Sequence, residues 1–182
     1  MRWLALSLGI VLLSVSANAQ LGIYGKFVAT RFSGTEGAGS KVTTWLYGPG
    51  AGVYYDFIHR GLIAVGADVR GEFLSGTQQK YRSGLFGLRV SARAPVLPVR
   101  PYIQGSAGVG GIESTNSGIV GNHYDNKFLY AVFGGIDLTI FPHIDWRLAE
   151  AGYGRMSGVG SSTNVPASSI FTVSSGLVIR FP

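Results

Sequence analysis

Hydrophobic and polar residues alternate along most of this chain, in segments that are separated by polar or glycine-rich connectors. Alternation with a period of two predicts β-strands that are apolar on one face. In the clearest segment, Val65 and Val69 fall on one face, and Asp68 and Arg70 fall on the other. Strands are predicted at residues 21–32, 44–57, 62–74, 81–92, 100–112, 128–140, 144–155 and 169–181.

A helical interpretation of these segments fails, because they are β-branched, aromatic and rich in glycine, and each glycine inside a helix costs about 1 kcal/mol. The seventh segment, 144–155, has the weakest alternation, since Arg147 and Glu150 fall on opposite faces of a regular strand. We therefore expect one of these two charges to lie at a rim of the sheet.

The connectors between the segments differ in length. Three are short, at residues 58–61, 94–98 and 141–143, and the four that alternate with them are mostly longer and polar, at 33–43, 75–80, 113–127 and 156–168. Short turns at one end and long loops at the other are typical of outer-membrane barrels. A soluble β-sandwich is the alternative, but most segments carry a charge on the non-apolar face. An open sheet in lipid would leave unpaired backbone groups, so an all-β, eight-stranded, antiparallel up-and-down transmembrane barrel is predicted.

Composition agrees with a membrane barrel. Hydrophobic residues make up 46% of the chain and charged residues 13%, against about a quarter in most soluble proteins. No segment after residue 19 has the roughly 18 consecutive apolar residues that a membrane helix needs. The net charge of +6 could indicate nucleic-acid binding. However, the basic residues are scattered singly, so we expect no nucleic-acid partner. The lack of cysteine excludes zinc fingers and disulfides.

Residues 1–19 have the three parts of a secretory signal peptide. Arg2 gives a basic start, residues 4–15 are mostly apolar, and Ala17 and Ala19 form a small-x-small cleavage site before Gln20. The apolar stretch is too short to span a membrane. We therefore expect cleavage before Gln20 and a mature barrel domain at residues 20–182.

The last predicted strand ends in a polar-x-Gly-x-x-apolar-x-aromatic pattern formed by Ser174, Gly176, Ile179 and Phe181. This pattern resembles the terminal-strand signal of outer-membrane proteins, which implies that the barrel-assembly machinery is a partner during insertion. The chain departs from the family pattern at Pro182, which follows the aromatic residue.

With these features together, residues 20–182 resemble the eight-stranded OmpA/OmpX-type outer-membrane barrels. The resemblance covers the whole predicted mature chain through its strand pattern and end signal, not through a catalytic signature. It implies a monomer in the lipids of a bacterial outer membrane. No peptidoglycan-binding domain is expected after the barrel.

The sequence offers little catalytic chemistry. Its histidines are His59, His123 and His143, all predicted in connectors, and no His-x-Ser pair lies on a strand as it does in the barrel lipid A deacylases. Asp125 near His123 could bind a metal weakly, but ordinary loop polarity explains the pair better. The glycine-rich segment at 34–41 lacks the P-loop spacing, because Ser40 separates its last glycine from the lysine. We expect no catalytic residue, cofactor or metal.

The charged residues predicted to point inward suggest what fills the barrel. An eight-stranded barrel is just wide enough for side chains to fill it. Four basic and five acidic residues are close to neutral, whereas a selective pore usually shows a bias of one sign. An ion-pair network is therefore predicted, with Lys26, Asp68, Arg70 and Glu150 at its centre; the alternative is charges that sit in interior water and couple weakly. The full set is Lys26, Asp56, Asp68, Arg70, Glu72, Arg89, Asp137, Glu150 and Arg180.

The opposite faces of the strands predict a lipid belt with aromatic residues at both interfaces. The belt comprises Val53, Tyr55, Val65, Val69, Leu88, Val90, Ile136 and Ile179. The aromatic residues are Trp45, Tyr47 and Phe73 at the outer interface, and Phe57, Phe141 and Phe181 at the periplasmic one. A non-catalytic structural or surface-interaction protein is the leading functional hypothesis. A narrow passive channel and a lipid-modifying barrel enzyme are the alternatives.

Overall fold

The computed structural model describes residues 20–36, 40–76, 79–93, 97–114, 125–157 and 168–181. The predicted signal peptide at 1–19, with Ala17 and Ala19 of its cleavage site, and the loop residue His123 lie outside the described residues. In the described part of the chain, no helix is long and apolar enough to cross a membrane. The strands are β1 (Gln20–Glu36), β2 (Ser40–Arg60), β3 (Ile63–Ser75), β4 (Gln79–Ala92), β5 (Val99–Ser114), β6 (Asp125–Phe141), β7 (Ile144–Ser157) and β8 (Ser168–Phe181).

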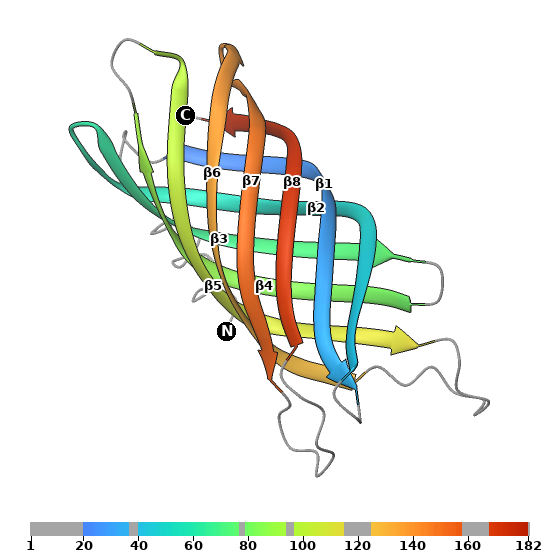
Figure 1. Cartoon of the computed structure of the whole chain (residues 1–182). Helices are drawn as coiled ribbons and strands as arrows, with labels where there is room; N and C mark the ends of the chain where they lie inside the picture. The colour runs from blue at the N-terminus through green and yellow to red at the C-terminus, as the bar shows by residue number, and fades with distance from the viewer. Residues whose placement is uncertain are drawn as a thin grey trace, which may run out of the picture.

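The eight strands form one closed barrel in which each strand pairs with its neighbours in the sequence (Figure 1). All pairs are antiparallel, and β1 closes the barrel against β8 from Leu21↔Phe181 to Ser33↔Ser169. The predicted fold class is confirmed. Closure gives every strand a partner on both sides, so the sheet leaves no edge of unpaired backbone groups.

The turn end holds the connections β2–β3, β4–β5 and β6–β7, and the loop end holds the others. The predicted contrast in connector length holds only in part. Two residues separate β2 from β3 and β6 from β7, and ten separate β5 from β6 and β7 from β8, but the six between β4 and β5 exceed the three at β1–β2 and β3–β4. Gly61 in the β2–β3 turn has a left-handed φ of 58°, and His143 in the β6–β7 turn has one of 71°. Such backbone is what tight hairpins between twisted strands require.

The predicted loop at 33–43 is too long. β1 and β2 continue to pair beyond the barrel wall as far as Glu36↔Ser40. Backbone hydrogen bonds hold such a hairpin without an apolar face, so the loss of alternation after Phe32 did not mark the end of the strand. The predicted turn at 58–61 is also misplaced, because β2 continues to Arg60 and β3 begins at Ile63.

The outer surface is apolar around the barrel. Of the predicted lipid belt, Val69 and Leu88 are 57% and 58% exposed, and only Tyr55 and Val65 are half-buried. Trp45, Tyr47 and Phe73 are exposed toward the loop end, and Phe57, Phe141 and Phe181 toward the turn end. An apolar band with aromatic residues at both edges fits a lipid bilayer.

A β-bulge in β7 corrects the sequence interpretation of that strand. The register shifts between Arg147 and Glu150 against β8, and Ala149 and Arg147 pair with the consecutive residues Ile136 and Asp137 of β6. The extra residue reverses the alternation. Arg147 and Glu150 therefore both point into the barrel, each 0% exposed, and neither lies at a rim.

The barrel interior as candidate functional site

The charges of the barrel interior meet at Glu150 of β7. Its Oε1 accepts hydrogen bonds from Lys26 Nζ at 2.8 Å and from Arg70 Nη1 at 3.0 Å. Ser174 Oγ donates to the same oxygen at 3.0 Å, and Tyr102 OH donates to Oε2 at 2.6 Å. Four other strands, β1, β3, β5 and β8, thus supply contacts to one carboxylate, which is how a buried charge becomes tolerable.

Arg70 of β3 is the second junction. Its Nε donates to Asp68 Oδ1 at 2.9 Å, and its Nη2 donates to Gln104 Oε1 at 2.7 Å. Gln104 Nε2 donates in turn to Asp68 Oδ1 at 2.7 Å, and Tyr24 OH donates to Asp68 Oδ2 at 2.8 Å. All five N–H groups of a guanidinium need acceptors when buried, and this arrangement uses each of its nitrogens. We call Lys26, Asp68, Arg70, Glu72, Gln104 and Glu150 the central network.

Asp137 of β6 holds a second group of charges toward the turn end. Arg89 Nη2 donates to its Oδ2 at 2.8 Å, and Arg147 Nε donates to its Oδ1 at 2.9 Å. Arg147 Nη1 also lies 3.6 Å from Glu150 Oε2, which links this group to the central network. Nearest the turn end, Arg180 Nε lies 2.8 Å from Asp145 Oδ2.

Aromatic rings separate the guanidinium groups. The Arg89 guanidinium carbon lies 4.2 Å from the ring centroid of Tyr54 and 3.9 Å from that of Tyr102. The Arg147 carbon lies 4.2 Å from the centroid of Tyr24. A ring face attracts a cation, and more strongly when water is excluded. These contacts place ring faces against Arg89, whose Nε and Nη1 find no hydrogen-bond acceptor in the described part of the chain.

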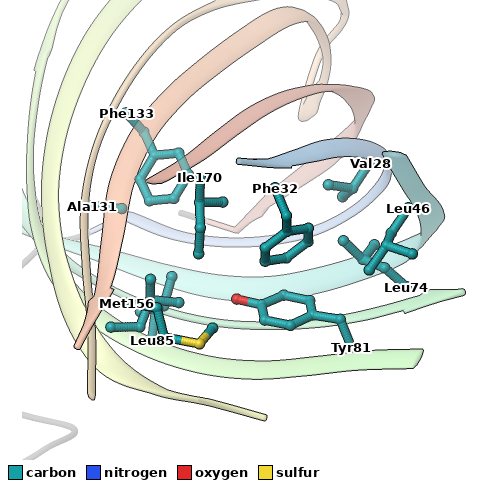
Figure 2. Packing of buried hydrophobic residues seen from close by; sticks show 11 residues of the cluster. Val28, Phe32, Leu46, Leu74, Tyr81, Leu85, Ala131, Phe133, Met156 and Ile170 are labelled. Carbon is teal, nitrogen blue, oxygen red and sulfur yellow. The ribbon is translucent and has the colours of Figure 1, made fainter. Parts of the chain in front are cut away.

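The loop half of the interior is mainly apolar, with a few buried hydroxyl groups such as those of Thr30 and Thr172. Side chains from several strands point toward one another inside the barrel (Figure 2). Phe32 meets Tyr81 edge-on, with ring centroids 4.9 Å apart. We call this cluster the apolar cap; it comprises Val28, Phe32, Leu46, Leu74, Tyr81, Leu85, Leu129, Ala131, Phe133, Met156 and Ile170. Side chains therefore fill the lumen in two successive zones, one ionic and one apolar.

The structure places all nine inward-assigned charges inside the barrel, the most exposed being Arg180 at 9%. Lys26, Asp68, Arg70 and Glu150, expected at the centre, are in direct contact. Lys26 Nζ also lies 2.9 Å from Glu72 Oε1. Asp56 is buried, but its Oδ1 has no hydrogen-bond partner among the described residues.

Several interior residues were missed by sequence reasoning. Asp145 and Arg147 are both 0% exposed, and half-buried Arg100 lies 4.0 Å from Asp145. With these three, the described interior holds six basic and six acidic side chains. The basic ones are Lys26, Arg70, Arg89, Arg100, Arg147 and Arg180, and the acidic ones are Asp56, Asp68, Glu72, Asp137, Asp145 and Glu150. Alternation alone could have shown Tyr24, Tyr54 and Tyr102 on the inward face, where a hydroxyl needs a partner.

The residues of the predicted end signal are split between the two faces of β8. Ser174 points inward to Glu150, whereas Ile179 and Phe181 are exposed on the outer surface. Gly176 pairs with Lys26 of β1, and a Cβ there would lie 2.6 Å from Lys26 Cα. Gln20, the predicted first mature residue, begins β1 and accepts a hydrogen bond from Arg100 Nη1 at 3.1 Å.

The other sequence candidates stay apart. His59 lies at the turn end of β2, and His143 is exposed in the β6–β7 turn. Within the described ranges, no group of three His, Cys, Asp or Glu side chains could hold a metal ion. The glycine-rich segment at 34–41 belongs to the β1–β2 hairpin, and residues 37–39 lie outside the described ranges.

Two solved structures share this architecture. Neisserial surface protein A is 14% identical with a TM-score of 0.56, over 87% of this chain and 97% of that one. Ail, the attachment invasion locus protein of Yersinia pestis, solved with the heparin analogue sucrose octasulfate, is 15% identical with a TM-score of 0.54, over 90% and 99%. No family model and no curated protein matches the sequence. The chain thus has the fold of the eight-stranded OmpA/OmpX-type barrels of bacterial outer membranes.

Proposed function

We propose that this protein is a non-catalytic barrel of the bacterial outer membrane with a structural or surface-interaction role. The filled lumen is the observation that carries the proposal. Six basic and six acidic side chains balance one another inside the described barrel, below an apolar cap. A conducting pore needs a continuous wet path, usually lined with a bias of one sign, and the balanced, side-chain-filled interior argues against both.

The partners that follow from this role are outer-membrane lipids and, during insertion, the barrel-assembly machinery. We propose a monomer with no cofactor and no nucleic-acid partner. Contacts with other surfaces would fall to the loop end. The names of the two similar proteins, a surface protein and an attachment protein, support such a role for this fold.

Conductance separates this proposal from a narrow passive channel. The purified protein, reconstituted in planar bilayers, is expected to show no steady openings, because the ion pairs and the cap exclude a continuous water column. Heat-modifiable mobility of the same sample on gels controls for folding. Steady openings from the wild-type barrel would overturn the plug and favour the channel.

Lipid analysis separates it from a lipid-modifying barrel enzyme. Lipid A from cells with and without the protein is expected to give the same mass spectrum. Heat-modifiable mobility of the protein from the same cells shows that it is folded. A lipid A species that appears only when the protein is present would overturn the non-catalytic assignment.

A further inference from the structure

The outer surface of the barrel is hollowed near its loop end, between β4, β5 and β6. A groove of about 320 Å³ is lined by residues 82–84 of β4, 109–111 of β5 and Asn126 of β6. The strand register places Arg82 beside Gly111, and Gly111 beside Asn126, in one row across the three strands. We call this the outer groove. Its volume lies at the lower end of the range for small-molecule sites.

Strand alternation shows that the outer groove faces away from the lumen. Tyr81 and Leu85 belong to the apolar cap inside the barrel, so Arg82 and Gly84 point outward, and both are exposed. On β5, Val109 is 57% exposed. The outer groove therefore opens toward the lipid.

Glycines create the hollow. A Cβ added at Gly84 would meet nothing within 4 Å, so the space above it is open. Gly84 pairs with Gly71 of β3, which extends the low region toward a fourth strand. Phe73 and Phe86, 59% and 58% exposed, stand beside these glycines along their strands. Aromatic side chains thus stand next to the open space above Gly84, which leaves room there for a hydrocarbon chain.

The charge of the outer groove lies at its headgroup end. Arg82 precedes Phe86, near the middle of β4, by four residues. At about 3.3 Å per residue and a tilt near 40°, Arg82 lies about 10 Å from mid-barrel, close to the edge of an apolar band about 25 Å tall. The planar guanidinium fork matches a phosphate, and the Asn126 amide adds a donor across the same row.

We propose that the outer groove binds a phosphate-bearing lipid of the outer leaflet. One acyl chain lies over Gly84 and Gly111, and the phosphate lies between Arg82 and Asn126. The proposal rests on the barrel spanning a membrane. A second copy of the chain fits less well, because a two-fold interface brings identical patches together and would set the two Arg82 guanidinium groups against each other.

Native mass spectrometry of the full protein, purified in detergent, tests the outer groove with dioleoylphosphatidylglycerol and, as an uncharged match, dioleoylglycerol. Wild type is expected to retain one phosphatidylglycerol and little dioleoylglycerol. Arg82→Gln should weaken retention about tenfold, as expected for one charge-assisted hydrogen bond. Gly84→Leu should abolish it, because a Cβ at this position meets nothing within 4 Å and the side chain extends into the groove.

Arg31→Gln is the matched control, since Arg31 is also exposed toward the loop end but lies beside Trp45 and Phe171 instead of glycines. Equal retention in wild type and both groove variants, or an equal loss in Arg31→Gln, overturns the proposal. The proposal is also overturned if the wild-type protein is a dimer that Gly84→Leu dissociates, because a second copy of the chain would then occupy the outer groove. If the protein forms a heat-modifiable barrel but binds no lipid, only the proposal for the outer groove is overturned. If carbonate extracts the protein from membranes, the proposed membrane role is overturned as well.

Discussion

Arg70 donates a hydrogen bond of 3.0 Å to Glu150, a residue 80 positions further along the chain, and both side chains are sealed from solvent. Lys26 approaches the same oxygen at 2.8 Å. One carboxylate oxygen therefore ties β1, β3 and β7 together across the barrel. These strands are not adjacent in the sheet, so their side chains meet across the lumen of the closed barrel.

Removing Arg70 should destabilise the barrel strongly. Arg70→Ala leaves Asp68 without its cation and Glu150 with one fewer, and an uncompensated buried charge costs about 3–5 kcal/mol. Urea titration of the protein in lipid vesicles measures the free energy of unfolding. Lys80→Ala, an exposed change on β4, controls for the loss of a basic side chain. An equal loss of unfolding free energy in both variants would show that the lumen charges couple weakly through water.

A double-mutant cycle isolates the Arg70–Glu150 pair. Glu150→Gln alone leaves Lys26 and Arg70 short of a counter-charge, so it should also be costly. Arg70→Met combined with Glu150→Gln should cost less than the sum of the two single changes, by about 1–3 kcal/mol, as contacting residues usually do. Additive losses would mean that the two groups do not interact in the folded barrel.

The apolar cap should add stability without being the only seal. Phe32→Ala removes a ring that packs edge-on against Tyr81, and deleting a buried phenylalanine costs about 3–5 kcal/mol. The central network remains below the cap, so the variant is expected to stay silent in planar bilayers. Steady openings from Phe32→Ala alone would show that the ion pairs do not close the lumen.

The lipid-facing surface explains why so much of the fold could be predicted. The side chain of Val69 faces lipid, whereas those of its neighbours Asp68 and Arg70 face the charged lumen. This contrast in polarity between successive residues shows which face of the strand each one occupies. Near the loop end this contrast is lost. Leu46 and Leu74 point inward beside outward Trp45 and Phe73, so alternation gave no sign of the apolar cap.

The β7 bulge shows where a strict period of two fails. A regular strand puts Arg147 and Glu150 on opposite faces, yet the structure buries both. The charges themselves held the signal, because neither can face lipid cheaply, and one extra residue between them satisfies both. Asp145 and Arg100 were missed for another reason, because they lie near the turn end. There the sequence pattern does not distinguish a charge that faces water at the rim from one that faces the lumen.

Position in the membrane should set the cost of a charge on the outer surface. Val69 lies mid-strand in β3 and is 57% exposed, so Val69→Arg should cost about 2–4 kcal/mol. Val65, predicted as part of the belt, is only two residues from the turn end of β3 and half-buried. Val65→Arg should therefore cost about 0–1 kcal/mol near the interface. Vesicle unfolding titrations compare the two, and equal costs would contradict this placement of the barrel in the bilayer.

Two residues of the end signal should fail at different steps of assembly. Gly176 pairs with Lys26 where β8 closes on β1, and a Cβ there would lie 2.6 Å from Lys26 Cα. Gly176→Asp should therefore block closure even when the pure chain refolds into lipid vesicles. Phe181 is exposed at the last β1–β8 pair, Leu21↔Phe181. Phe181→Ala leaves closure possible and removes only the terminal aromatic group.

The two variants therefore separate a recognition signal from a packing requirement. In vesicles without assembly machinery, Phe181→Ala should give as much heat-modifiable barrel as wild type, whereas Gly176→Asp should give little. In cells, both should be exported but accumulate as unfolded-like chains on unheated gels. Ile179→Val, a conservative change on the same exposed face, should behave as wild type in both assays. A wild-type yield of folded Phe181→Ala in cells would contradict the role of the terminal aromatic residue as an insertion signal, because this variant lacks only the aromatic side chain that the assembly machinery is expected to recognise.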